Sequence, residues 1–226
     1  MGRKESRIQS WTSRFLLTVF IILTTQNLIS SPVDDHQERF EDVALKIWEY
    51  AELGYLEEKS SGLLQQELED SGFTIQSGIA GIPTAFIAEY NNGGPVLGIL
   101  GEFDALPGLS QQNVPFKTAE GLSSANGHAC GHHLFGAASA WAVVAIKEWL
   151  EESGTPGTIR FYGTPAEEGG SGKVYIARDG YFDDVDIVLH WHPASGNSAD
   201  AQSSNSNKSG KFTFSGISAH AASAPE

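Results

Sequence analysis

The sequence has few cysteines and few basic residues, and both shortages restrict what the protein can be. Cys130 is the only cysteine among 226 residues, so no disulfide can form within the chain. The 14 Lys and Arg residues stand against 28 Asp and Glu, which gives a formal net charge of -14. Because such an acidic surface repels phosphate backbones, we expect no nucleic-acid partner.

Long apolar runs are also missing, and the longest lies near the N-terminus. Residues 15–23 are almost all apolar, four basic residues precede them, and polar and small residues follow up to Pro32. The run is too short to cross a bilayer comfortably and is typical of the core of a signal peptide. We therefore predict that residues 1–31 direct export, to the outside or to the endomembrane lumen. An uncleaved membrane anchor is the alternative.

The rest of the chain is predicted to alternate between helices and strands, from apolar spacing and from the positions of Gly and Ser. Ser60 or Ser61 is expected to cap the second helix. The strand at 95–100 is a continuous apolar run, as expected of a strand buried on both faces. Helices are predicted at 35–50, 60–70, 134–150 and 173–178, and strands at 73–75, 84–88, 95–100, 158–162 and 186–189. The order from residue 95 onward implies an α/β fold with a mostly parallel sheet and helices on both faces.

Two domains are expected after the export segment. Residues 36–208 are predicted to form the first, and the segment 194–209 at the junction has the Ser, Asn and Ala content of a linker. Residues 211–214 are predicted to start a new strand in a second domain. Because the chain stops inside that element, we expect the sequence to be a fragment.

Residues that can bind metals or transfer protons follow the predicted strands. In open parallel sheets, ligands bind at the carboxyl ends of the strands, which meet at one edge. The only thiol lies between the first two of these strands, in a Gly-rich segment at 127–133, just before a helix. We therefore expect one edge of the sheet to gather the side chains of Glu102, Asp104, Cys130, His132, Glu167, Glu168, His190 and His192.

Cys130 and His132 are two residues apart, so a thiolate and an imidazole can face the same ion. A helix start lowers the pKa of a cysteine, and metal binding deprotonates it. A lone cysteine is ordinarily a small buried hydrophobe, but the flanking His128 and His133 favour a metal ligand. A cysteine nucleophile paired with a histidine is the other interpretation, and it leaves the two glutamates without a role.

The adjacent Glu167 and Glu168 lie in a loop with few basic residues. Beside a metal, one glutamate can bind the ion while its neighbour takes a proton from metal-bound water. His192 precedes Pro193 at the end of an apolar strand, which favours it as a further ligand. His190 stays open as the alternative.

Two acidic residues after the first buried strand are candidates for a supporting role. Asp104 can orient a ligating histidine without touching the metal. Its ordinary alternative is a turn-forming aspartate before Pro107. Glu102 is a weaker candidate for the same role.

Three long motifs occur in order along the chain: GEFDALPGLSQ at 101–111, GHACGHH at 127–133 and GTPAEEGGSGK at 163–173. With them, the sequence from about residue 36 to its end resembles the family-twenty metallopeptidases. That family includes aminoacylases, glutamate carboxypeptidases and auxin-conjugate amidohydrolases. In particular, the chain resembles the branch with aminobenzoyl-glutamate utilisation protein B and the peptidase-domain protein that cleaves β-alanyl-lysine-type dipeptides.

The resemblance implies a zinc-exopeptidase-like catalytic domain and a homodimer of the full-length protein. It implies two divalent ions, zinc or manganese, with Cys130 in the bridging position. The other implied ligands are His132, Glu168 and His192. Glu167 matches the general base of a hydrolase in which a metal-bound hydroxide cleaves an N-acyl amino acid, a dipeptide or a similar conjugate.

The C-terminal residues have implied roles too. Residues 209–226 match the start of an inserted α+β lid or dimerisation domain, in which His220 reaches the substrate. The family has a further histidine ligand later in the chain, so we expect the 226-residue chain on its own to be inactive. His133 stands where relatives have Asp or Asn, which leaves one contact near the metal open. A non-catalytic homologue with a structural metal is the alternative, and it gives Glu167 no role.

Overall fold

The computed structural model describes residues 33–116 and 125–199, and toward the C-terminus residues 203, 206, 208, 210–220 and 222–223. The chain divides into two compact units, Met1–Pro193 and Ala194–Glu226. The predicted export segment, residues 1–31, lies outside the described residues. Within the described part, no helix is both long enough and apolar enough to cross a membrane.

Each helix and strand predicted up to residue 189 is confirmed in type, with ends that move by a few residues. The helices are α2 (Gln37–Tyr50), α3 (Glu58–Asp70), α4 (His132–Ser153) and α5 (Gly172–Arg178), with short 3-10 turns η1 (Asp34–His36) and η2 (Ile79–Gly81). The strands are β1 (Thr74–Ser77), β2 (Phe86–Asn91), β3 (Val96–Gly101), β4 (Thr158–Gly163) and β5 (Ile187–Leu189).

The five strands form one sheet in the order β1-β2-β4-β3-β5. β3 pairs in parallel with both β4 and β5, as predicted from the alternation with helices. The two N-terminal strands differ, because β1 pairs antiparallel with β2 and β2 pairs antiparallel with β4. The crossover through α4 returns the chain beside β3. β4 therefore separates β2 from β3, although only a short turn joins them in sequence.

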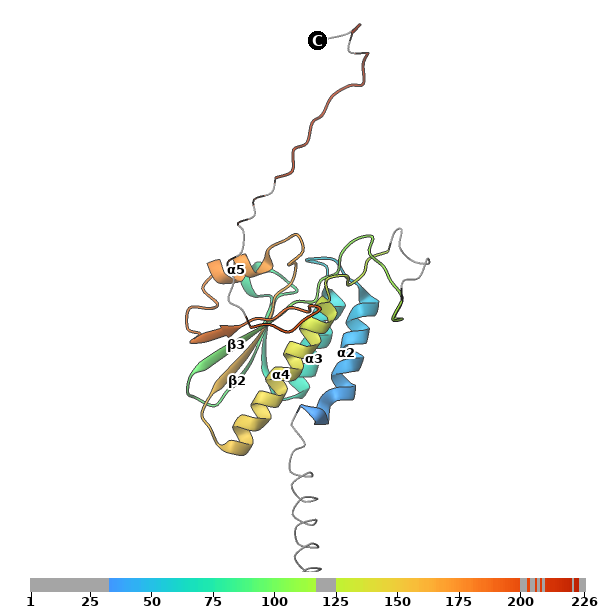
Figure 1. The fold of residues 1–226 in the computed structure, drawn as a ribbon. Coiled ribbons are helices and arrows are strands. Elements are labelled where there is room, and N and C mark those ends of the chain that lie inside the picture. The colour runs from blue at the N-terminus through green and yellow to red at the C-terminus, as the bar shows by residue number, and fades with distance from the viewer. Residues whose placement is uncertain are drawn as a thin grey trace, which may run out of the picture. The chain divides into compact units, whose positions relative to one another are not determined.

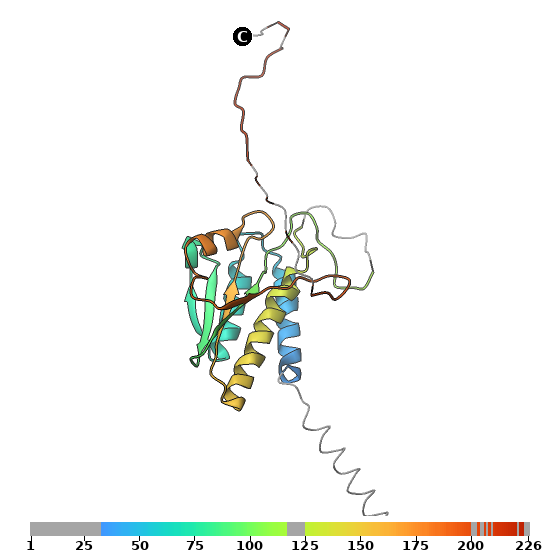
Figure 2. The same cartoon turned by 60° about the vertical axis from the view of Figure 1, so that its left-hand side comes forward.

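Helices cover both faces of the sheet, as predicted. α2, α3 and α4 pack together against one face (Figure 1), and Figure 2 shows α2 and α4 on one side of the strands. The core between them includes Phe40 and Ile47 of α2 and Phe86, Ile99 and Phe161 of the sheet. A second apolar cluster covers the other face and includes side chains of η2 and α5.

Two serines do not cap α3 as predicted. The helix begins at Glu58, so Ser60 and Ser61 lie inside its first turn and are buried. The Ser61 hydroxyl donates to the backbone carbonyl of Thr84 at 2.8 Å, and Ser60 donates to Glu52 Oε2 at 2.8 Å. The hydroxyls therefore fix α3 against its neighbours instead of satisfying its own first N–H groups.

The strand predicted at 211–214 is absent, because residues 210–220 form neither helix nor strand. Phe212 and Phe214 are exposed there, at 85% and 92%. A strand forms by pairing its backbone with a neighbour, and an isolated segment has none to pair with. The expected domain that starts at residue 209 stays a prediction.

The end of β4 has no room for a side chain, which predicts a large loss of stability. A Cβ at Gly163 would lie 2.2 Å from Cε1 of Phe86, and the Phe86 ring is fully buried. Because overpacking of a core costs about 1–3 kcal/mol, Gly163→Ala is expected to lower the free energy of unfolding by that amount. Denaturant unfolding measures this.

Gly62 offers the matched control. It lies within α3, and a Cβ there would meet nothing within 4 Å. Gly62→Ala is therefore expected to raise stability by about 0.5–1 kcal/mol, since alanine reduces the freedom of the unfolded chain. Equal stability of Gly163→Ala and the parent protein would contradict the packing described at the end of β4.

Candidate metal centre

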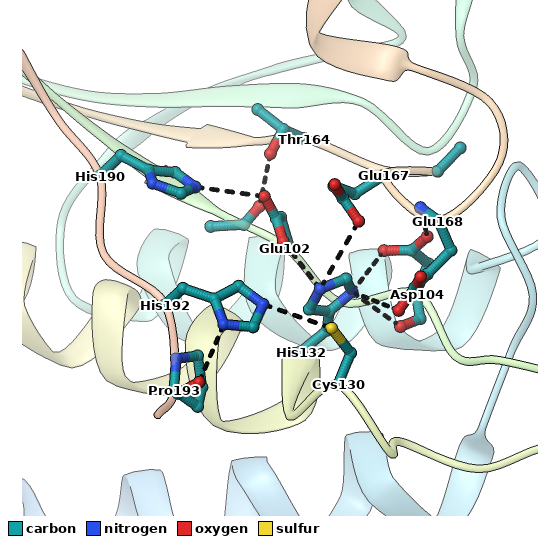
Figure 3. Close-up of polar contacts among 12 residues, drawn as sticks. Glu102, Asp104, Cys130, His132, Thr164, Glu167, Glu168, His190, His192 and Pro193 are labelled. Atoms are coloured by element: carbon teal, nitrogen blue, oxygen red, sulfur yellow. Dashed lines mark hydrogen bonds and ion pairs between the residues drawn. The ribbon is translucent and has the colours of Figure 1, made fainter. Parts of the chain in front are cut away.

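The carboxyl ends of three parallel strands bring the predicted residues to one edge of the sheet (Figure 3). β3 leads directly into Glu102, β4 leads into the loop with the two glutamates, and β5 leads into His190. The fourth contribution comes from the start of α4. Around this edge lie Glu102, Asp104, Cys130, His132, Glu167, Glu168, His190 and His192.

His132 lies at the centre of the group and is fully buried. Its Nδ1 is 2.9 Å from Oδ1 of Asp104 and 3.1 Å from the Asp104 backbone carbonyl. Since both are acceptors, Nδ1 carries the proton and donates it toward Asp104. The Nε2 atom forms an ion pair with Oε2 of Glu102 at 2.9 Å, and it would present its lone pair to an ion that displaces its proton. Asp104 therefore sits where it would orient a ligating imidazole.

Three buried polar atoms at this edge have no hydrogen-bond partner: His132 Nε2, Glu102 Oε2 and Glu168 Oε1. Buried polar groups are nearly always paired, since leaving them unpaired is costly. Ligand atoms of Cys130, His132 and His192 lie within 4.8 Å of one another, and so do those of Glu102, His132 and Glu167. Thiolate, imidazole and carboxylate suit zinc or manganese, so the residues fit the divalent ions that the sequence predicts.

The two glutamates are held by their own loop. The backbone N–H of Ala166 donates to Oε1 of Glu57 at 2.8 Å, and the N–H of Glu168 donates to Oδ2 of Asp104 at 2.9 Å. Ala166 has φ of +58°, a conformation that side chains rarely adopt. The fully buried Glu57 thus stabilises the strained backbone just before Glu167 and Glu168.

The side chains of the glutamate pair differ in exposure. Oε2 of Glu167 is 3.9 Å from His132 Nε2, and its side chain is 45% exposed. Oε1 of Glu168 is 4.0 Å from His132 Nδ1, and its side chain is only 20% exposed. The exposed carboxylate can meet water and substrate, while the Glu168 carboxylate is half-buried, with Oε1 shielded from solvent. This arrangement suits the predicted division into base and ligand, and both roles remain predictions.

The two histidines after β5 have different neighbours. Nε2 of His192 lies 3.4 Å from Sγ of Cys130, and its Nδ1 donates to the backbone carbonyl of Pro193 at 2.9 Å. Nε2 of His190 instead lies 3.3 Å from Oε1 of Glu102. His192 is therefore the histidine that lies with the thiol, and its preference over His190 as a ligand stays a prediction.

The predicted lowering of the Cys130 pKa is wrong for the protein without an ion. Burial, followed by the negative charges of Glu168, Glu167 and Glu102, raises the pKa of the thiol to about 11. Cys130 also lies just before α4, whose N-cap is Gly131, and the carboxylates outweigh the helix end. This environment disfavours an activated cysteine nucleophile and favours a thiolate that forms only with a bound cation.

The same carboxylates perturb the buried groups around them. Burial lowers the pKa of His132, but the adjacent carboxylates of Asp104 and Glu102 outweigh it and raise this pKa to about 10 in the protein without an ion. Burial raises the pKa of Glu102, yet its contacts with His132, His190 and Lys173 outweigh that effect and hold it well below its usual range. Glu102 is therefore ionised throughout the physiological range.

Sequence reasoning missed two residues of this centre. Glu57 supports the Ala166 backbone from the start of α3, and no motif marks it. Lys173 forms an ion pair with Glu102, and its place at the end of the third motif could have marked it.

Three other histidines that the sequence analysis singled out have contacts outside the candidate metal centre. The rings of His128 and His133 lie 5.1 Å apart and are tilted, neither belongs to a group of potential ligands, and His128 contacts the Ile47 carbonyl. His220 belongs to the second unit, where its Nδ1 lies 3.3 Å from the Ser223 hydroxyl. Its contact with substrate stays a prediction.

Together, the sheet and the potential metal ligands at its edge form an α/β domain of the kind that metal-dependent hydrolases use. Residues 98–207 match the family model "Peptidase family M20/M25/M40". The chain belongs to the M20 peptidase family, which confirms the resemblance carried by its three motifs.

Known relatives support this assignment. The chain is 43% identical to one subunit of the p-aminobenzoyl-glutamate hydrolase of Escherichia coli K12 over 197 residues, 87% of this chain and 41% of the relative. It is 33% identical to human Xaa-Arg dipeptidase over 184 residues, 74% of this chain and 38% of the relative. A dinuclear metal-binding M20 peptidase of Bacillus subtilis matches with a TM-score of 0.61 and 26% identity, over 71% of this chain and 44% of that one. The chain thus spans about two fifths of the curated relatives' length.

Proposed function

We propose that the complete protein is a metal-dependent hydrolase that cleaves the amide bond of an N-acyl amino acid, a dipeptide or a similar conjugate. The observation that carries this proposal is the set of buried, unpaired ligand atoms around His132. The relatives' names, a hydrolase of an aminobenzoyl-glutamate conjugate and a dipeptidase, support the class of substrate.

Two divalent ions, zinc or manganese, are proposed as cofactors, and the ligands in this chain are Cys130, His132, Glu168 and His192. When bound, such ions polarise the amide carbonyl and lower the pKa of water. By accepting the proton of Nδ1, Asp104 leaves Nε2 as the nitrogen through which His132 would bind an ion. The name of the Bacillus relative, a dinuclear metal-binding peptidase, supports the number of ions.

Glu167 is proposed as the general base. Its carboxylate is exposed and close to His132, so it can accept a proton as water attacks the carbonyl carbon. Glu167 then returns that proton to the amide nitrogen while the C–N bond breaks, which releases a carboxylate and a free amine. Glu57 contributes indirectly, because it fixes the backbone that aims Glu167.

The two alternatives predict different behaviour. A cysteine nucleophile needs a thiol with a lowered pKa, whereas the surroundings of Cys130 raise it. A structural metal site needs no exposed carboxylate beside the ligands, and Glu167 is one.

The proposal is tested with a chain of the relatives' full length. Metal content is measured by mass spectrometry, and hydrolysis is measured with a panel of acylated amino acids and dipeptides. We expect about two ions per subunit, turnover of at least one substrate class, and loss of turnover after chelation that zinc or manganese restores. Turnover that survives complete removal of metal would contradict the proposal.

His220 is proposed to contact the substrate from a lid domain that begins at residue 209, and the complete protein is proposed to be a homodimer. The E. coli relative is named as a subunit, which supports assembly of that protein.

Export is proposed for residues 1–31, on the basis of the basic start and short apolar core. Mass spectrometry of the native protein is expected to find a mature N-terminus between Ser30 and Val33. Asn207, outside the described residues, would then be a glycosylation site, since Ser209 completes the motif. An intact Met1 in a cytosolic fraction would contradict export, and an intact Met1 in a membrane fraction would identify an anchor.

A further inference from the structure

We propose that Glu102 is itself a ligand of a bound cation, through its Oε2 atom, and that Lys173 is the positioning residue that holds it. The inference rests on the proposed function, because it requires that this edge of the sheet binds a divalent ion. It adds a carboxylate to the ligand set proposed above.

The two oxygens of Glu102 have different surroundings. The residue directly follows β3 and is 2% exposed. Oε1 accepts a hydrogen bond from Nζ of Lys173 and lies 3.3 Å from Nε2 of His190. Oε2 has no hydrogen-bond partner. A buried carboxylate with one oxygen unpaired is costly unless a cation occupies the open side.

The open oxygen points at a second unpaired atom. Oε2 lies 2.9 Å from Nε2 of His132, as Figure 3 shows, and Nε2 also lacks a hydrogen-bond partner. Because Asp104 accepts the proton of Nδ1, a cation that displaces the proton of Nε2 would lie beside both Nε2 and Oε2. Two ligands of one tetrahedral zinc ion, each about 2.0–2.2 Å from it, lie about 3.3–3.6 Å apart. Oε2 and Nε2 therefore need to separate by only about half an ångström to bind one ion together.

Lys173 explains why Oε2 faces the centre. It projects from α5, and its ammonium group neutralises the outer oxygen of Glu102. Four carboxylates lie around His132, and Lys173 forms an ion pair with the first of them. They are Glu102, Asp104, Glu167 and Glu168. By holding Oε1, Lys173 restricts the rotation of the carboxylate, and the inner oxygen stays directed at His132.

The test compares the cation affinities of variants of this chain. Zinc dissociation constants are measured by competition with a chromophoric chelator, and cobalt binding is followed by its thiolate charge-transfer band. We expect Glu102→Gln to weaken zinc binding by at least about tenfold. Residues that only support a metal ligand contribute about 10–100-fold to affinity, and a ligand itself should contribute no less. The cobalt–thiolate band is expected to persist at saturating cobalt, because Cys130 still binds.

Glu89→Gln is the matched control, since Glu89 also pairs with a cationic side chain, that of Arg160. It is expected to leave the zinc dissociation constant unchanged within about twofold, because it belongs to neither group of potential ligands. Thermal unfolding of the metal-free variants separates loss of a ligand from loss of fold.

Lys173 is tested by a double-mutant cycle. Lys173→Met is expected to change zinc affinity in the parent protein and to have no effect in the Glu102→Gln background, since Lys173 acts only through Glu102. Lys173→Arg is expected to restore the parent affinity in part. Equal effects of Lys173→Met in both backgrounds would overturn its role.

The outcomes separate this inference from the proposed function. If the parent chain binds zinc and folded Glu102→Gln binds it equally well, Glu102 is no ligand and the metal centre stands without it. If the parent chain and the full-length protein bind no cation, the proposed function fails as well. A crystal structure with zinc about 2.0–2.2 Å from Oε2 would support the ligation, and a hydrogen bond between Glu102 and His132 in the loaded protein would overturn it.

Discussion

Glu167→Gln is expected to lower kcat of the full-length protein by about 10²–10⁴-fold, the usual contribution of a general base, while the metal ions stay bound. The exposed carboxylate of Glu167 lies 3.9 Å from His132 Nε2, near enough to take a proton from an attacking water. Glutamine keeps the size of the side chain and removes its basicity. The measurement is kcat on the best substrate of the panel, together with metal content.

Glu168→Gln provides the matched control, one residue further along the same loop. Its side chain is half-buried and its buried Oε1 is unpaired, so it is expected to hold an ion. Its replacement should therefore reduce metal content as well as activity. Equal metal loss in the two variants would contradict the division of roles, and full metal with full activity in Glu167→Gln would remove Glu167 from the mechanism.

Local patterns predicted the secondary structure well because each helix or strand has its cause in neighbouring residues. In α2, Phe40, Val43, Ala44 and Ile47 recur at helical spacing and all are buried. The apolar run of β3 is buried toward its end, at the centre of the parallel strands. Periodicity of this kind is readable from one sequence.

The position of β2 could not be predicted in the same way. Only a turn separates β2 from β3 in sequence, yet β2 pairs with β4, more than sixty residues further along. Which strand becomes a neighbour depends on the crossover through α4 and on packing of the whole core. Ser61 shows the same limit, since its hydrogen bond to Thr84 replaces the local capping role that its residue type suggests.

The candidate site shows the same difference between features with local causes and features with long-range causes. The gathering of its potential ligands was predictable, because chain topology brings the ends of β3, β4 and β5 to one edge. The supporting contacts of Glu57 and Lys173 were not, since each joins residues 71 or more positions apart. The electrostatic balance at Cys130 also depends on those distant carboxylates, so its direction emerged only with the structure.

Cys130 is expected to react slowly with iodoacetamide in the metal-free protein and hardly at all in the zinc-loaded protein. Its pKa of about 11 leaves about 100-fold less thiolate at pH 8 than an ordinary cysteine has. The higher nucleophilicity of a more basic thiolate offsets about tenfold of this, so alkylation should be about tenfold slower than that of a reference thiol. Since the pKa is raised, the rate should keep rising with pH beyond 9, where an ordinary thiol levels off. Zinc should suppress the reaction by coordinating the thiolate.

The measurement is the pH profile of alkylation by mass spectrometry, with the denatured protein as the control that returns to the reference rate. A fast, pH-independent reaction near pH 7 would instead reveal an activated thiol, and the cysteine-nucleophile mechanism would then replace the metal-dependent one.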